Sequence, residues 1–202
     1  MHAVATHLLG DHLSRLSRSR DRWDGDGPRP GEASPSFIDR HNDEWVTASG
    51  PVSPRVLVDL LERAADDIAG SWRSVDMERP GEPVTWAGSD AAPTWLDCAR
   101  DYTEWWVHHR PIRAAVGAPL LRDPSFMRPV IHTFAVALAK TLDEHAAVPD
   151  GAKVHLEIEG PSGGAWWCSR EAQRWETARD RARVTGESPL IDATLQVLAI
   201  IR

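Results

Sequence analysis

The chain has 202 residues, a formal net charge of −7 at pH 7 and two cysteines. This acidic balance excludes a general nucleic-acid binder, which needs a basic surface to bind phosphates. Two cysteines without metal-type spacing are typical of a reducing compartment. The start of the chain shows no export signal, and no apolar run reaches the ~18 residues of a membrane helix. We therefore expect a cytoplasmic protein that does not enter a membrane.

Three helices are predicted before residue 76, from apolar residues that recur at helical spacing. The first covers residues 4–20 and ends in a run of arginines, and the second covers residues 36–48. Ser53 followed by Pro54 is a strong start signal for the third helix, because serine can cap it and proline suits its first turn. The predicted buried face of this helix consists of Leu57, Leu60, Leu61, Ala64 and Ile68.

Two further helices are predicted in the middle of the chain. After a turn-rich stretch around PVTWAG, a long helix runs from Thr94 to about Val116 and is ended by Gly117. The next helix begins somewhere within residues 124–130. Inside the long helix, Pro111 cannot donate a backbone hydrogen bond, so we expect a kink over residues 107–111.

Beyond Pro149 the apolar spacing changes from helical to alternating, which indicates strands. KVHLEIEG and AWWCSR, separated by the turn PSGG, predict a β-hairpin. RARVTG is predicted as a third strand and PLIDATLQVLAII as a closing helix. The expected fold is mainly α with a small α+β appendage. Its helical bundle covers residues 1–127, and residues 128–202 form a linking helix and the small α+β domain.

Chemistry-bearing side chains gather on the long helix. Glu104 and His108 lie four residues apart and therefore on one helix face. Such a pair can hold a divalent metal, although it is also a common side-chain hydrogen bond. Catalytic zinc uses three protein ligands and an open fourth position, so a third ligand must come from elsewhere. His7 in the first helix is the leading candidate and His12 its competitor. Asp11 would accept a hydrogen bond from the other ring nitrogen of His7.

Five segments resemble, in order and spacing, the mycothiol-dependent maleylpyruvate isomerase family. They are THLLGDHLSRLS, FIDRHNDEWV, SPRVLVDLL, PVTWAG and DYTEWWVHHRPIRAAVG. GPSGGAWWCSR followed by Trp175 is similar to the tail domain of this family. The resemblance implies a DinB-like four-helix bundle followed by the small α+β domain.

The bundle departs from the family at its start. In the family a full helix precedes the His-Leu motif that corresponds to His7 and Leu8, whereas Met1 lies only six residues before His7. We therefore expect that the first helix of the bundle is missing. Either the chain starts inside the real gene, or a second copy of the chain covers the exposed apolar face as a homodimer.

The resemblance implies a divalent metal, usually Zn²⁺, held by His7, Glu104 and His108, with mycothiol as cofactor or co-substrate. Zinc deprotonates a bound thiol, so the metal-bound thiolate would be the nucleophile. The expected activity is isomerisation of, or S-transfer to, a small carboxylate-bearing electrophile. His109 points about 100° away from His108 around the helix and is left out of the ligand set.

Trp86, Arg110 and Arg113 are the candidates for substrate contacts, with the alternative that both arginines are solvated or paired with acids such as Asp101. An arginine can pair bidentately with a substrate carboxylate, and a tryptophan in a loop can form a pocket wall. Two other functions stay open. The first is a non-catalytic DinB-like module that binds a metal or a small molecule, and the second is a hydrolase that uses zinc-activated water.

Overall fold

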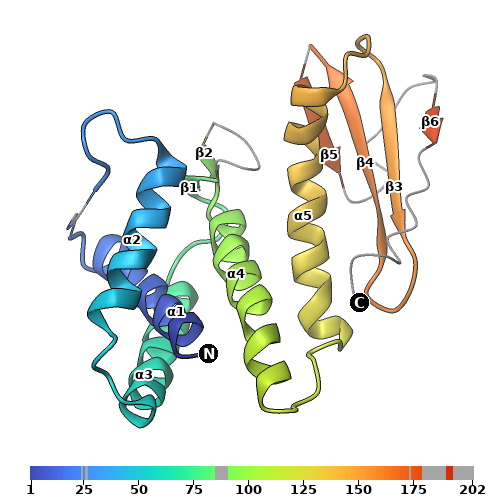
Figure 1. Ribbon diagram of the computed structural model, residues 1–202. Helices are drawn as coiled ribbons and strands as arrows, with labels where there is room; N and C mark the ends of the chain where they lie inside the picture. The colour runs from blue at the N-terminus through green and yellow to red at the C-terminus, as the bar shows by residue number, and fades with distance from the viewer. Residues whose placement is uncertain (24, 26, 85–90, 173, 179–189, 193–202) are drawn as a thin grey trace. The chain divides into compact units, whose positions relative to one another are not determined.

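A computed structural model describes the whole chain except residues 24, 26, 85–90, 173, 179–189 and 193–202 (Figure 1). Within the described residues the protein is mainly helical, with a small share of sheet. The chain divides into two compact units. The first contains Met1–Asp76 and Val107–Leu120, and the second contains Met77–Trp106 and Leu121–Arg202. The domain boundary predicted between residues 127 and 128 stays a prediction.

The first unit starts with the three predicted helices. They are α1 (His2–Arg15), α2 (Ser34–Ala48) and α3 (Pro54–Arg73). The last turn of the first predicted helix, Leu16–Arg20, is π-helical rather than α-helical. Ser53 caps α3 as predicted, because its hydroxyl oxygen accepts a hydrogen bond from the backbone N–H of Val56 at 3.4 Å.

The core of the first unit lies between α1 and α3. Leu9 of α1 packs against Leu57 and Ala64 of α3, and the residues around them are Ala5, Leu13, Val52 and Leu61. This confirms most of the predicted buried face of α3. Leu60, however, is 40% exposed. It lies about 60° around the helix from Leu57, at the edge of the apolar stripe, so the core does not cover it.

Gly10 allows α1 and α2 to approach each other closely. A Cβ atom at this position would lie 2.6 Å from Cγ of Trp45 on α2. That distance is far inside van der Waals contact, so an added methyl group must push the two helices apart. The helical Gly70 of α3 differs, because a Cβ there would meet no atom within 4 Å.

This pair of glycines predicts effects of opposite sign. Alanine in place of a helical glycine ordinarily stabilises by about 0.5–1 kcal/mol, and we expect that gain for Gly70→Ala. Gly10→Ala should instead lower the free energy of unfolding by about 1–3 kcal/mol, because of overpacking against Trp45. Urea denaturation of both variants beside the wild type measures the two changes. A stabilised Gly10→Ala variant would contradict the close approach of α1 and α2.

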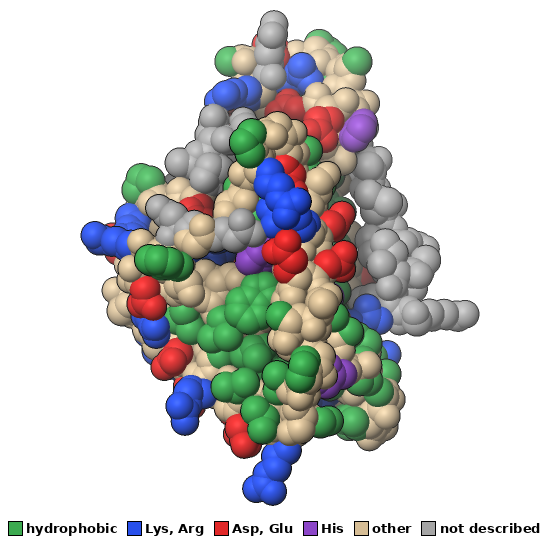
Figure 2. Space-filling model, turned by 60° about the vertical axis from the view of Figure 1, so that its left-hand side comes forward, with side chains coloured by type: hydrophobic (Ala, Val, Ile, Leu, Met, Phe, Trp, Pro, Cys, Tyr) green, Lys and Arg blue, Asp and Glu red, His purple; other side chains and the backbone are tan. Residues whose placement is uncertain are grey.

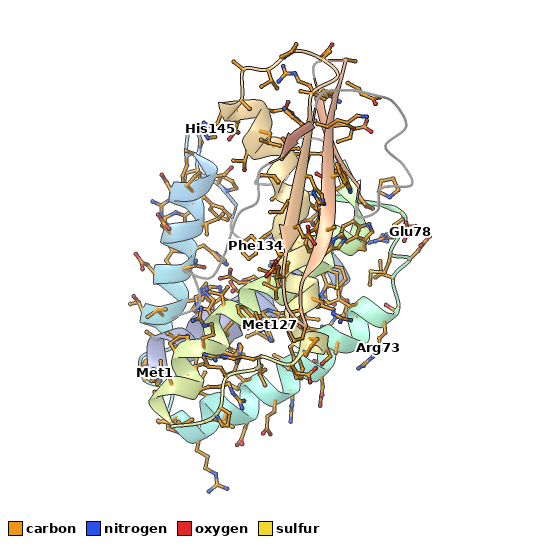
Figure 3. All side chains as sticks on the ribbon, turned by 90° about the vertical axis from the view of Figure 1, so that its right-hand side faces the viewer. Met1, Arg73, Glu78, Met127, Phe134 and His145 are labelled. Atoms are coloured by element: carbon orange, nitrogen blue, oxygen red, sulfur yellow. The ribbon has the colours of Figure 1, made fainter. Side chains whose placement is uncertain are left out.

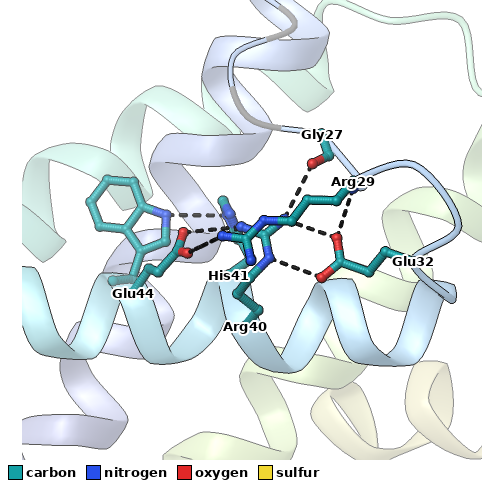
Figure 4. Close-up of polar contacts among 7 residues, drawn as sticks. Gly27, Arg29, Glu32, Arg40, His41 and Glu44 are labelled. Atoms are coloured by element: carbon teal, nitrogen blue, oxygen red, sulfur yellow. Dashed lines mark hydrogen bonds and ion pairs between the residues drawn. The ribbon is translucent and has the colours of Figure 1, made fainter.

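Arg40 anchors the loop before α2 to that helix (Figure 4). Its guanidinium donates hydrogen bonds to the two carboxylate oxygens of Glu32 at 2.9 and 3.0 Å and to the carbonyl of Gly27 at 3.2 Å. It also donates to Glu44 at 3.1 Å. The hydrogen bond from Arg40, with a second from the backbone of Arg29, lowers the pKa of Glu32 to about 2. The anchor is therefore complete above the ordinary glutamate pKa and is lost as the pH falls toward 2.

The second unit contains two sheets. β1 (Pro80–Pro83) pairs antiparallel with β2 (Ala91–Pro93). The other sheet has the order β5-β4-β3-β6, in which β6 runs parallel to β3 and the remaining pairs are antiparallel. Its strands are β3 (Lys153–Ile158), β4 (Gly164–Glu171), β5 (Arg174–Ala178) and β6 (Leu190–Asp192). The predicted hairpin is thus confirmed as β3 and β4.

Two predictions for the end of the chain need correction or stay open. RARVTG, predicted as the third strand, lies outside the described residues, and the strand beside β4 is β5. The closing helix predicted from Pro189 is wrong for Leu190–Asp192, which form β6 along β3. A short apolar run does not distinguish strand from helix, and here the backbone groups of β3 provide the hydrogen-bond partners. The rest of that predicted helix lies outside the described residues.

α5 (Pro124–His145) covers one face of the four-stranded sheet, from Met127 near its start to His145 at its end (Figure 3). Trp166 of β4, only 2% exposed, packs with Leu156 of β3 and Ala135 of α5. A second cluster under α5 consists of Ala152, Cys168 and Trp175. The alternation predicted for β3 is confirmed, because its apolar side chains all face this helix.

The long predicted helix is α4, and it extends from Thr94 to Ala115. Gly117 follows it with a φ angle of 66°, the left-handed conformation that ends many helices. The helix continues unbroken through Pro111, which is exposed and lies in its last turns. The kink predicted over residues 107–111 stays a prediction.

The surface mixes hydrophobic and charged side chains (Figure 2). On α3, Val56, Val58 and Leu60 are exposed, and so is Ile38 of α2. The homodimer that would cover an apolar face stays a prediction. No helix in the described part of the chain has the length and apolar character needed to cross a membrane.

Candidate metal centre

Two histidines from distant parts of the chain meet in the first unit. Nε2 of His7 on α1 lies 3.2 Å from Nε2 of His108 on α4. Their ring centroids are 4.6 Å apart and the ring planes are inclined by 72°. The two rings therefore present the same nitrogen to one point in space, and both side chains are partly buried.

Glu104 completes a group of three. It lies one turn before His108 on α4, and this helix is continuous across the division between the units. Its position relative to His108 therefore follows from helix geometry alone. One ligand atom from each of His7, Glu104 and His108 lies within 4.8 Å of the other two. The structure thus brings together the three side chains that were singled out as ligands.

The geometry of this group fits a single metal ion. Two imidazole nitrogens bound tetrahedrally at about 2.0–2.1 Å from zinc lie roughly 3.3 Å apart. The observed separation between the two Nε2 atoms is 3.2 Å. Two imidazoles and one carboxylate form a donor set that zinc and other divalent transition metals accept. Without a cation the same distance allows one ring N–H to donate to the other nitrogen, so the ion would take the place of that proton.

Asp11 touches His7 in a way the sequence did not indicate. Its Oδ2 lies 3.4 Å from Nε2 of His7, one helical turn away. The expected contact was with the other ring nitrogen, so that expectation needs correction. Both carboxylate and imidazole rotate about their own side-chain bonds, and residue spacing does not determine which nitrogen is reached. The carboxylate is thus on the side of the ring that faces His108.

Two other histidines, His12 and His109, lie outside the group formed by His7, Glu104 and His108. His12 is buried at 6% exposure on α1, about 140° around the helix from His7. His109 follows His108 and points about 100° away from it. Neither belongs to the group of His7, Glu104 and His108 found among the described residues.

Of the three predicted substrate contacts, the two arginines lie in the described part of the chain. Trp86 lies outside the described residues. Arg113 donates from Nε to the backbone carbonyl of Pro119 and so binds the loop after α4. Arg110 follows His108 by two residues, about 200° around the helix, and therefore projects from another side of α4.

Both cysteines of the chain are free thiols. Burial raises the pKa of the Cys168 thiol, which packs under α5. A raised thiol pKa leaves little thiolate near neutral pH. Cys98 is half-buried on α4. Neither cysteine belongs to the group of possible metal ligands found among the described residues.

Ser14, His41 and Trp45 form a second polar cluster, which the sequence did not predict. Ser14 of α1 lies 2.9 Å from Nε2 of His41 on α2, and the indole Nε1 of Trp45 donates to the Ser14 hydroxyl oxygen at 3.1 Å. The serine hydroxyl can then donate to His41. These residues come from helices that are distant in sequence, and no motif links them. The cluster connects α1 to α2 beside Gly10.

Comparisons with protein-family models, with curated proteins and with solved structures found no match for this chain. The resemblance to the mycothiol-dependent maleylpyruvate isomerase family therefore stays a prediction.

Proposed function

We propose that the protein binds one divalent cation, with Zn²⁺ as the best fit, through His7, Glu104 and His108. The observation that carries this proposal is the convergence of three ligand atoms within 4.8 Å of one another, from α1 and α4. Three protein ligands leave an open coordination position, which is the arrangement of catalytic rather than structural zinc sites.

The open position can serve a small-molecule thiol. Zinc at such a site deprotonates a bound thiol and lowers the pKa of bound water to about 7. The chain's own part is to hold the ligand atoms at fixed positions on two helices. All three ligands are only partly buried, so a small molecule can approach them. The family resemblance favours a mycothiol-dependent isomerase or S-transferase that acts on a small carboxylate-bearing electrophile.

Metal analysis tests the cation site first. Wild-type protein loaded with Zn²⁺ and passed through a desalting column should retain about one equivalent, because a matched ligand set binds zinc tightly. His7→Ala and His108→Ala should retain almost none. His145→Ala is the matched control, since His145 is exposed at the end of α5. Equal zinc in the wild type and all three variants would refute the site.

Titration with mycothiol then separates thiol chemistry from the other functions. With the Co²⁺-substituted protein, a thiol bound to the metal adds a sulfur-to-cobalt absorption band in the near ultraviolet, and His108→Ala should lack it. Retained metal without this band would favour a bare binding module or a hydrolase. Hydrolysis of an activated ester that depends on the metal would then identify the hydrolase.

A further inference from the structure

Two helices each present an imidazole and a carboxylate at a spacing of four residues. On α4 the pair is Glu104 and His108, and on α1 it is His7 and Asp11. Side chains at this spacing lie on one helix face, one above the other. The two histidines meet at 3.2 Å between their Nε2 atoms, so the two pairs approach each other through their imidazoles. Three of these four side chains are the proposed ligands of the cation, and the fourth is Asp11.

Asp11 lies close to the proposed cation site but outside the group of the three proposed ligands. Its Oδ2 lies 3.4 Å from Nε2 of His7, the nitrogen that faces His108. Two ligands on one ion with bonds of about 2.0–2.2 Å lie roughly 3–3.5 Å apart, which matches this contact. Asp11 is nevertheless outside the group whose ligand atoms lie within 4.8 Å of one another. A side-chain rotation must therefore bring it closer to Glu104 and His108.

Asp11 is the more exposed member of the pair with His7, although its Oδ2 atom is buried. Its side chain is 29% exposed, whereas that of His7 is 15% exposed. The backbone at Asp11 lies inside α1, which extends from His2 to Arg15, so only side-chain torsions need to change. Charge favours the movement, because Glu104 alone leaves a divalent ion with a net charge of about +1 and a second carboxylate neutralises it.

We propose that Asp11 is a fourth ligand of the cation in the resting protein, and that an incoming anionic ligand displaces it. This inference rests on the proposed cation site. It makes the resting site a set of two imidazoles and two carboxylates, one of each from α1 and from α4. A carboxylate that leaves on ligand binding gives the site an open position only when a ligand arrives.

Asp11→Asn tests the proposal, since it removes the negative charge and keeps the size of the side chain. Dissociation constants for Zn²⁺ and Mn²⁺ are measured by competition with a chelator. We expect Asp11→Asn to weaken binding by at least about 10-fold, with the larger loss for Mn²⁺, because hard ions depend more on carboxylate oxygens. Asp11→Glu, which retains a carboxylate, should recover part of the loss. Asp39→Asn on the exposed side of α2 is the control and should change nothing.

The visible absorption of the Co²⁺-loaded protein decides whether Asp11 is a ligand or only supports His7. Wild-type and Asp11→Asn proteins should differ in their d–d bands without added thiol and become alike when 2-mercaptoethanol saturates the metal. Weakened affinity with identical d–d bands would overturn the proposal, because Asp11 would then act through His7. Unchanged affinity and unchanged bands would also overturn it and leave the cation site intact. A wild-type protein that binds no metal would instead refute the cation site itself.

Discussion

Zinc should raise the free energy of unfolding of the wild-type protein by about 4 kcal/mol when free zinc exceeds the dissociation constant 1,000-fold. The reason is linkage, since the ligand atoms converge only in the folded chain, where α1 and α4 bring them within 4.8 Å. In the unfolded chain His7 and His108 are separated by about 100 residues, so that state binds zinc much more weakly. Urea denaturation with and without zinc, in buffer free of other chelators, measures the difference.

His108→Ala should abolish this stabilisation, and His145→Ala should retain all of it. Metal-free wild type and His108→Ala provide the baseline, so that any loss of packing is separated from loss of zinc. The same zinc-induced gain in His108→Ala as in the wild type would mean that zinc binds elsewhere.

The helices were predictable because their ends have local signals. Ser53 with Pro54 indicated the start of α3, and the hydroxyl cap is present. Gly117, in the left-handed region, ends α4 as expected. These signals act through backbone hydrogen bonds within a few residues, so no knowledge of the tertiary fold is needed. The exposure of Leu60 shows the limit, because the width of the buried stripe depends on what packs against it.

The edge strands were not predictable by the same means. β5 contains a single large apolar residue, Trp175, so its sequence shows no alternation of apolar and polar residues that would indicate a strand. β6 has only three residues, Leu190–Asp192, and forms by pairing with β3 more than thirty residues earlier in the chain. Strand pairing of this kind is a tertiary interaction, which an apolar run in one sequence does not reveal.

Part of the candidate site was also predictable from the sequence, and part of it was not. Glu104 and His108 could be paired from helix spacing alone, since four residues make one turn. His7 required the family resemblance, because one histidine among apolar residues is more often a core residue than a ligand. The contact between Asp11 and Nε2 of His7 depends on rotamers, which spacing does not determine. Position along a helix was thus predictable, and the approach of two helices was not.

Trp166→Ala should cost about 3–5 kcal/mol of the free energy of unfolding, the usual range for removing a buried tryptophan. Trp166 is 2% exposed between α5 and the sheet, packed with Leu156 and Ala135. Its indole Nε1 also donates to Nδ1 of His132 at 3.0 Å. The His132 ring stacks against that of Trp95 as well, with 5.6 Å between their centroids. Truncation therefore removes apolar contact and one hydrogen bond together, and leaves a cavity.

Two further variants separate the contributions of apolar contact and of the hydrogen bond to the stability lost in Trp166→Ala. Trp166→Phe keeps an aromatic ring but loses the N–H donor, and should cost less than alanine, at about 1–3 kcal/mol. Trp23→Ala is the control, because Trp23 is 71% exposed and its removal should change stability by less than about 0.5 kcal/mol. Urea denaturation followed by far-ultraviolet circular dichroism measures all three, since the signal does not depend on the tryptophan removed. Equal stability of Trp166→Ala and Trp23→Ala would mean that Trp166 does not hold α5 to the sheet. Removal of a large side chain from a packed core must lower the free energy of unfolding.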